Sequence, residues 1–354
     1  MTENEFEKNL DTYLKNGSTM IVGVSGGPDS IYLLKRLFDY SQNHQLKIIV
    51  AHVNHGLRGK ENQIEEKFVQ NLAIKYEFPF ESIKLHLKTL HGKKPTPPAT
   101  KKETSFVAKS QKNGETNGNL EEIARQKRYA FFEKLRQKYD ADYVIVAHHL
   151  NDNIETALFN LIRGASFQGI KGMKMYNHQT HILRPLLKIT KKEILDFLKK
   201  NKLKSHFDES NKDLRFSRNL LRQKAIPLFN KINSGFEKTF QENLQNFTEI
   251  AEFIEEKSTT WLQKNLQDQR FPLTKFLELP SFLQKNILVQ LYQTTYGSTN
   301  KLTLQQLQEI LKVLKLQKSN RKKEFGTRFF IQVIKKNESS PREVELKLKP
   351  LKKA

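Results

Sequence analysis

The residues best suited to chemistry near the start of the chain are Ser25 to Ser30, with the sequence SGGPDS. Apolar residues precede this run in the pattern of a short buried strand, and apolar residues at helical spacing follow it. Gly26 and Gly27 let the backbone approach an anion closely, and Pro28 suits the first turn of a helix. Free backbone N–H groups and the positive end of a helix dipole meet there, so the run predicts a phosphate-binding loop.

Side chains of this SGGPDS loop add to the predicted phosphate site. The hydroxyls of Ser25 and Ser30 can donate hydrogen bonds, and Asp29 is placed to hold a Mg²⁺ ion that bridges phosphate oxygens. The loop has no lysine, so it matches neither the GxxxxGK[ST] loop nor the dinucleotide pattern GxGxxG. A glycine-rich turn without a ligand is the alternative. Six suitable positions between a strand and a helix favour the phosphate site.

A second group of polar residues follows the predicted strand 143–147, and it contains His148, Asp152 and Glu155. The two acids are three residues apart at the start of a predicted helix, 154–163, so both carboxylates can face the same side. Acids at a helix start also stabilise the helix alone, which is the alternative interpretation. At the end of a strand beside a phosphate loop, the pair can instead bind a cationic amine. It can also accept the proton that an amine, with a pKa of about 10.4, must lose before it attacks.

Arginines occur near both groups. Arg125 and Arg128 lie one turn apart on a predicted helix, 120–139, and Arg218 and Arg222 belong to a later basic helical segment. Such spacing is typical of phosphate contacts, but it also occurs on solvated helix faces and in surface ion pairs. The sequence therefore offers these arginines as candidates for binding anionic groups.

The predicted strand 46–53 has a nearly continuous apolar pattern, which is typical of a parallel sheet covered on both faces. It ends in HVNHGLR, which includes His52 and His55. Ligands of open α/β sheets bind at the carboxyl ends of strands, so these side chains point toward the loop site. Two histidines without a third ligand at suitable spacing favour orientation of a nucleotide over a metal site.

Strands and helices alternate through the first part of the chain, which predicts an α/β fold with a parallel sheet. We expect a nucleotide-binding domain over residues 1–210, interrupted by a flexible insertion at 88–119 that is rich in Lys, Thr, Pro, Gly and Asn. Residues 211–354 predict a mainly α-helical, basic region. A long helix over 235–267 allows a homodimer, although ordinary packing explains it equally well.

The composition narrows the choice of partners. The 354 residues include 61 Lys and Arg against 38 Asp and Glu, a formal charge of +23, which favours a polyanion such as RNA. A cationic membrane-binding protein and a codon bias of an AT-rich genome are the alternatives. Neither a bilayer-spanning apolar run nor a signal peptide is evident, so we expect a cytoplasmic protein without a membrane partner. The absence of cysteine excludes disulfides, thiolate zinc sites and a cysteine nucleophile.

The loop resembles the SGGxDS pyrophosphatase loop (PP-loop) of enzymes that split ATP between its α and β phosphates and leave AMP on a substrate. Members that transfer sulfur or release ammonia from glutamine use cysteines, which this chain lacks. The resemblance therefore leaves a free amine or free ammonia as the nucleophile.

Four blocks in order resemble the tRNA(Ile)-lysidine synthase family over most of residues 18–230: SGGPDS, HVNHGLR, EEIARQKRYAFF with AHHLNDNIET, and DESNKDLRFSRNLLR. The resemblance implies a two-step reaction on the wobble cytidine of the CAU-anticodon isoleucine tRNA. ATP adenylates the oxygen on carbon 2 with release of pyrophosphate, and the ε-amine of L-lysine then displaces AMP to form lysidine. Codon reading changes from AUG to AUA, and charging changes from methionine to isoleucine.

The resemblance also implies roles for single residues. His148 would lie at the reacting centre, and Asp152 and Glu155 would receive the substrate lysine. Asn151 stands where relatives usually have Asp. The ATP-binding and arginine positions are Ser25, Gly26, Gly27, Pro28, Asp29 with Mg²⁺, and Ser30, together with Arg125, Arg128 and Arg218 at the lysine carboxylate or the activated intermediate.

Two other functions fit parts of the sequence. One is an adenylating synthetase of the PP-loop class that uses ammonia and acts on a small molecule. The other is a basic RNA-binding protein that keeps a vestigial nucleotide loop. The intact acids Asp29, Asp152 and Glu155 argue against the second alternative, and the high positive charge argues against the first.

Overall fold

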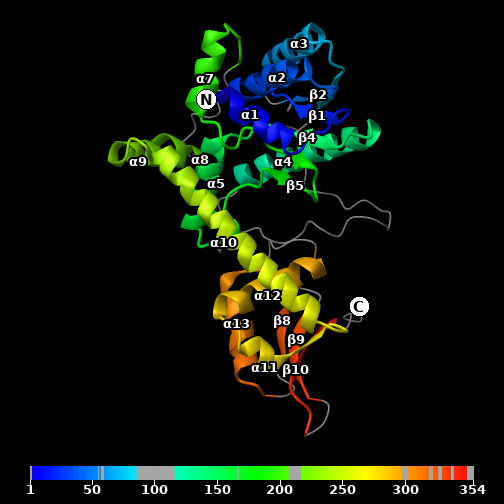
Figure 1. The fold of residues 1–354 in the computed structure, drawn as a ribbon, viewed down its shortest axis with the longest axis vertical. Helices are drawn as coiled ribbons and strands as arrows, with labels where there is room; N and C mark the ends of the chain where they lie inside the picture. Colours follow the sequence, from blue (N-terminus) through cyan, green and yellow to red (C-terminus); the bar gives the residue numbers. More distant parts are fainter. Residues whose placement is uncertain are drawn as a thin grey trace. The chain divides into compact units, whose positions relative to one another are not determined.

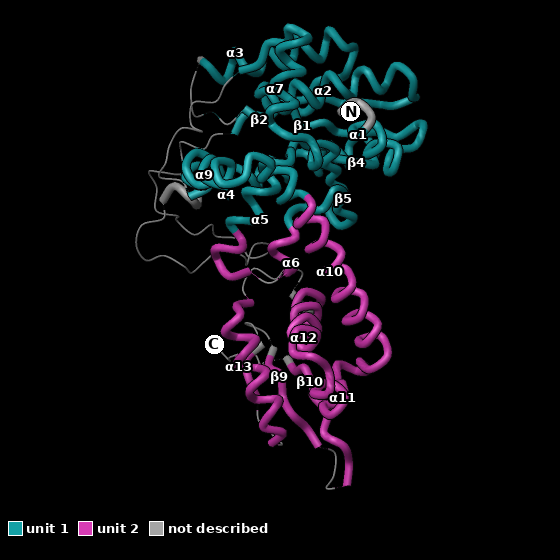
Figure 2. Tube along the Cα trace, turned by 60° about the vertical axis from the view of Figure 1, so that its left-hand side comes forward, with its two compact units in different colours: residues 1–159, 172–241 teal, residues 160–171, 242–354 magenta. Residues whose placement is uncertain are grey.

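A computed structural model of the 354-residue chain describes residues 2–54, 56, 60–85, 116–165, 167–206, 217–296, 302–318, 322–325, 329–335 and 339–348. The chain divides into two compact units, coloured separately in Figure 2. The N-terminal unit contains residues 1–159 and 172–241, and the C-terminal unit contains residues 160–171 and 242–354.

The N-terminal unit is built on a six-stranded sheet in the order β3-β2-β1-β4-β6-β5 (Figure 1). All neighbouring strands are parallel except β5 and β6, which pair antiparallel. The predicted parallel α/β sheet is thus confirmed. The strands are β1 Thr19–Gly23, β2 Lys47–Asn54, β3 Phe80–Lys84, β4 Tyr143–Ile145, β5 Tyr176–Asn177 and β6 Ile182–Leu183.

Helices cover both faces of this sheet. Side chains alternate along a strand, so Met20 and Val22 of β1 belong to one buried cluster and Ile21 belongs to another. The first cluster includes side chains of α1, α2, α3 and α7, and the second includes α4. The helical segments of this unit are α1 Thr2–Asp11, α2 Pro28–Ser41, α3 Lys60–Lys75, α4 Thr116–Lys138, α5 Leu150–Ile162, α7 Lys191–Lys200, α8 Ser217–Leu220, a π-helical turn η3 Leu221–Ala225, and α9 Ile226–Ile232.

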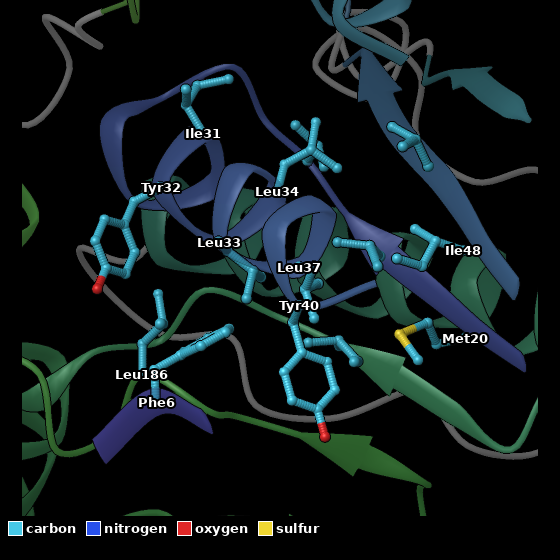
Figure 3. Close-up of a cluster of buried hydrophobic side chains, with 14 of the residues drawn as sticks. Phe6, Met20, Ile31, Tyr32, Leu33, Leu34, Leu37, Tyr40, Ile48 and Leu186 are labelled. Atoms are coloured by element: carbon cyan, nitrogen blue, oxygen red, sulfur yellow. The ribbon is translucent and has the colours of Figure 1, made fainter. Parts of the chain in front are cut away.

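Helix α2, which follows the SGGPDS loop, packs almost entirely in the core. Leu33, Leu34 and Leu37 are fully buried, and Figure 3 shows them among side chains that include Met20 of β1 and Ile48 of β2. Burying each leucine contributes about 1.5–3 kcal/mol. The loop is therefore carried by the most tightly anchored helix of the unit.

The C-terminal unit combines helices with a four-stranded antiparallel sheet in the order β7-β10-β9-β8. Its core joins α11, α12 and α13 to this sheet. The helices were predicted, but the sheet was not. None of the helices in the described ranges combines the length and the apolar character needed to cross a membrane. The elements are α6 Phe167–Ile170, α10 Phe236–Asn265, α11 Leu273–Leu277, α12 Ser281–Tyr296, α13 Leu304–Lys315, β7 Arg270–Pro272, β8 Lys322–Phe325, β9 Phe329–Ile334 and β10 Glu343–Leu348.

Several boundaries differ from the predicted ones. Helix α5 begins at Leu150, four residues before the predicted start, so Asp152 lies in its first turn. Helix α4 begins at Thr116, which makes the last residues of the predicted insertion helical, whereas 88–115 lie outside the described residues. The compact units divide inside α5 and α10. The expected domain boundary at 210/211 falls in 207–216, which is also outside the described residues, and stays a prediction.

Truncation of the α2 core tests this account of the fold. We expect Leu34→Ala to lower the free energy of unfolding by about 2–5 kcal/mol, because Leu34 is fully buried and the lost side chain leaves a cavity. Leu195→Ala on α7 is the control, since Leu195 is 38% exposed, and should cost less than about 1 kcal/mol. Urea denaturation followed by circular dichroism measures both. Equal losses in the two variants would contradict the account.

Candidate active site

The SGGPDS loop joins the end of β1 to the start of α2. Gly26 has φ +91°, a left-handed conformation that favours glycine. Gly27 is extended at φ −74° and caps α2, and no side chain bonds to this cap. Pro28 takes the first helical position, as predicted. The backbone conformation that a phosphate-binding loop requires is therefore present.

The two serines of the loop hold its shape. The Ser30 hydroxyl accepts a hydrogen bond from the Gly26 N–H at 3.1 Å and donates one to the Gly27 carbonyl at 2.9 Å. The Ser25 hydroxyl accepts from the Gly27 N–H at 3.3 Å and lies 3.2 Å from the Ser30 hydroxyl. Ser30 is only 4% exposed. Ser30 thus braces the loop, whereas Ser25 lines the cavity beside it.

That cavity lies at the carboxyl edge of the parallel sheet and has a volume of about 650 Å³. Open α/β sheets bind their ligands at this edge. Its walls come from the loop, the end of β2, the start of α5, the start of α7, the π-helical turn and the start of α10. The polar lining residues are Ser25, Asp29, His52, Asn54, Asn62, Glu65, Arg128, His149, Asn151, Asp152, Glu155, Lys191, His206, Arg222, Asn230 and Glu237.

The imidazole of His149 joins the two predicted groups of residues. Its Nε2 atom lies 3.6 Å from a carboxylate oxygen of Asp29 and 3.5 Å from one of Asp152. The His149 backbone N–H also donates to Asp152 at 3.1 Å. The loop carboxylate and the first acid of α5 therefore face the same small space, as the sequence predicted, but the sequence analysis did not single out His149.

His148 points elsewhere. Its Nδ1 atom accepts a hydrogen bond from the Nε–H of Arg184 at 3.3 Å, and it is not among the residues that line the cavity. Burial lowers the pKa of His148 to about 4, although the nearby Asp152 opposes this. The ring is consequently neutral at neutral pH and accepts from Arg184. The predicted place of His148 at the reacting centre stays a prediction.

The acids of α5 are paired with Arg222 on the π-helical turn. Its Nε and one terminal nitrogen bind the two oxygens of Glu155 at 2.6 and 2.8 Å, and the same terminal nitrogen reaches Asp152 at 3.1 Å. Glu155 is 4% exposed. Burial raises the pKa of Glu155, and the hydrogen bonds from Arg222 oppose that rise. The acids already hold a cation, as expected of an amine site.

The other predicted arginines differ in position. Arg128 lines the cavity, with its guanidinium 5.6 Å from the centre of the Tyr129 ring. Arg125 lies over the other side of this residue's surroundings, 5.3 Å from the same ring centre, and Arg218 lies 5.7 Å from the Phe159 ring centre. Neither Arg125 nor Arg218 lines the cavity. Their proposed contacts with a substrate carboxylate stay predictions.

His52 supports orientation rather than metal binding. It is 2% exposed, and its Nδ1 atom lies 2.8 Å from the carbonyl of Val24, just before the loop. Among the described residues, no group of three or more His, Asp or Glu side chains could hold a metal ion. The neighbouring His55, Leu57 and Arg58 of the HVNHGLR block lie outside the described residues.

Removing Arg222 tests the charge balance at the acids. We expect Arg222→Met to lower the free energy of unfolding by about 1–3 kcal/mol at pH 7, because Glu155 then stays buried without its partner. The raised pKa of Glu155 means that its charge opposes folding once the pH exceeds that pKa, so the loss should shrink as the pH falls. Chemical denaturation between pH 4 and about 8 measures this.

Two variants complete this test. Arg222→Met combined with Glu155→Gln should recover much of the loss at pH 7, since no buried charge remains. Arg218→Met removes an equivalent charge from the preceding turn, where the side chain is exposed, and should have little effect at any pH. A loss that is the same at every pH would refute the proposed balance.

Comparisons with known proteins follow this geometry. A tRNA(Ile)-lysidine synthase from Bacillus cereus is 35% identical over 255 residues, which are 72% of this chain and 49% of that protein. One from Geobacillus kaustophilus is 31% identical over 290 residues, covering 80% of this chain and 58% of that protein. The chain thus spans about half the length of the curated relatives it matches.

The fold has solved counterparts as well. The U34-tRNA thiolase NcsA from Methanococcus maripaludis, solved with its [4Fe-4S] cluster, aligns with a TM-score of 0.55 at 17% identity. The alignment covers 70% of this chain and 78% of that chain, which shows a shared fold. The family model of the PP-loop domain matches residues 2–229, more than half of the chain. The loop, the sheet around it and this match together show that the chain belongs to the PP-loop domain family.

Proposed function

We propose that this chain ligates L-lysine to carbon 2 of the wobble cytidine in the CAU-anticodon isoleucine tRNA, with ATP as the activating substrate. The observation that carries the proposal is the position of His149, which places the loop carboxylate Asp29 and the acid Asp152 within 3.6 Å of one imidazole. A phosphate site and an amine site thereby share one cavity. The relatives named tRNA(Ile)-lysidine synthase support this reaction.

In the first step, ATP lies with its phosphates at the SGGPDS loop. The oxygen on carbon 2 of cytosine attacks the α phosphorus, the bond to the β-phosphate oxygen breaks, and pyrophosphate leaves. The backbone of Gly26 and Gly27 and the N-terminus of α2 face the developing negative charge. Ser30 keeps these groups in place through its two hydrogen bonds within the loop.

Mg²⁺ fits this site through its carboxylates. Asp29 and Asp152 flank the same imidazole, and Mg²⁺ in phosphate sites takes one or two carboxylates together with phosphate oxygens and waters. Asp29 would hold the ion, with Asp152 beside it. When bound, the ion neutralises phosphate charge and stabilises the leaving pyrophosphate.

In the second step, the lysine ε-amine takes the place of the Arg222 guanidinium at Asp152 and Glu155. The acids bind the ammonium group and accept its proton, and the neutral amine attacks carbon 2 while the bond to AMP breaks. Burial raises the pKa of Glu155, which makes this carboxylate a better proton acceptor than an exposed one. Arg222 must yield these contacts for the amine to bind.

The remaining predicted contacts belong to the same proposal. Arg128 at the cavity, with Arg125 and Arg218, would bind the lysine carboxylate or the activated intermediate. The basic region 211–354 would bind the tRNA, and its last part, 301–354, carries 15 Lys or Arg against 5 Asp or Glu. Catalytic and RNA-binding parts then correspond to the expected domains 1–210 and 211–354. A homodimer stays a prediction.

Lysine incorporation tests the function. A CAU-anticodon isoleucine tRNA transcript with ATP and labelled lysine should become labelled by the wild-type protein. We expect Asp29→Ala and Asp152→Ala to reduce the rate by about 10²–10⁴, since each removes a charge that acts on the phosphates or the amine. Asp39→Ala is the control, because Asp39 lies near the other end of α2 in a surface pair with Lys35, and it should keep full activity.

Two outcomes would contradict the proposal. A wild-type protein that releases pyrophosphate from ATP without tRNA would instead support the ammonia-using synthetase. Unchanged incorporation in Asp152→Ala would remove the acid from the amine site, even if the tRNA is modified.

A further inference from the structure

The SGGPDS loop has no lysine of its own, yet the fold brings one to it. The ammonium group of Lys191, the first residue of α7, lies 2.5 Å from a carboxylate oxygen of Asp29. The two residues are 162 positions apart in the sequence. The Lys191 side chain is 33% exposed and lines the cavity. It therefore faces both the loop carboxylate and the space where the phosphates would lie.

We propose that Lys191 is the cation that binds the β and γ phosphates of ATP, and then the pyrophosphate that leaves. This inference rests on the proposed function. A lysine ammonium has three N–H donors on a flexible stem, so it can keep one hydrogen bond to Asp29 and give the others to phosphate oxygens. Asp29 alone would repel the phosphates, and the paired ammonium removes that repulsion.

The start of α7 is fixed by its own cap. The Thr190 hydroxyl accepts a hydrogen bond from the Glu193 N–H at 3.2 Å, and Glu193 accepts one from the Thr190 N–H at 2.7 Å. This capping box satisfies two backbone donors of the first turn. Lys191 thus begins from a rigid backbone, which places its side chain at the loop without a search through many conformations.

Asn151 supplies a second anchor. Its carbonyl oxygen accepts a hydrogen bond from the Lys191 N–H at 2.8 Å, and its amide nitrogen donates to Glu237 at the start of α10 at 2.7 Å. Only a neutral amide performs both functions. An aspartate here would place its carboxylate against that of Glu237, and the repulsion would loosen the support of Lys191.

The other cations of the cavity are in different positions. Arg222 binds Glu155 and Asp152, the acids of the proposed amine site. Arg128 contributes to the cavity from α4, beside the Tyr129 ring. Lys191 is the cavity cation that contacts the loop itself. This division assigns Lys191 to the phosphates and Arg222 to the amine side.

Nucleotide binding without tRNA or lysine tests the inference. We expect Lys191→Met to weaken the binding of ATP and of pyrophosphate by about 10- to 100-fold, the loss of one charge-assisted contact, and to leave the binding of AMP unchanged. Lys191→Arg should bind ATP more tightly than Lys191→Met because the charge is kept. Lys192→Met is the matched control, since Lys192 is the exposed neighbour on α7, and it should bind all three ligands like the wild type. Isothermal titration calorimetry measures each affinity.

The support from Asn151 has its own test. Asn151→Asp should weaken ATP binding, and adding Glu237→Gln should restore it, because the double variant again pairs an amide with a carboxylate. A wild-type affinity for ATP in Lys191→Met would overturn the proposal, and so would an equal loss of AMP binding. Because the assay needs neither tRNA nor lysine, it judges Lys191 separately from the proposed lysine transfer.

Discussion

The site depends on the parallel pairing of β1 with both of its neighbours. Met20 of β1 pairs with Ile48 of β2 and with Tyr143 of β4, so the three strands run in the same direction and end at the same edge. The chain leaves β1 into the SGGPDS loop and leaves β4 into the first turn of α5. Both groups of chemically useful residues are therefore delivered to one edge by backbone hydrogen bonds, before any side chain contacts another.

Paired charges then organise the cavity. On one side Asp29 is neutralised by Lys191, and on the other Asp152 and Glu155 are neutralised by Arg222. Partly buried charges without partners are costly, so these pairs stabilise the empty site. Each internal pair also has the charge pattern of a substrate contact, with the cation near Asp29 suited to phosphates and the acids near Arg222 suited to an amine. Binding then exchanges one set of partners for another, with little loss of charge compensation.

The sequence was informative where the signal is local. The apolar patterns of β1 and β2, the helix after Pro28 and the conformation of the loop all follow from residues close together in the chain. The acids of α5 were placed correctly at the shared edge, because the end of a parallel strand determines that edge whatever packs around it.

The sequence was less informative where side-chain direction or distant packing decides. Which of His148 and His149 enters the cavity depends on the backbone between β4 and α5, and both are equally suited by type. Lys191 and Arg222 reach the site from elements that carry no motif for that role. The strand β10 does alternate, with Val344 and Leu346 buried, but its lysines and glutamates resemble a solvated charged tail.

The most direct test of the central claim is to locate the lysine on the RNA. The CAU-anticodon isoleucine tRNA is incubated with the protein, ATP and lysine, then digested to nucleosides and analysed by mass spectrometry. The account predicts that the wobble cytidine, and no other nucleoside, gains lysine, in amounts that match the AMP released. An unmodified wobble cytidine despite AMP release, or lysine at another nucleoside, would contradict it.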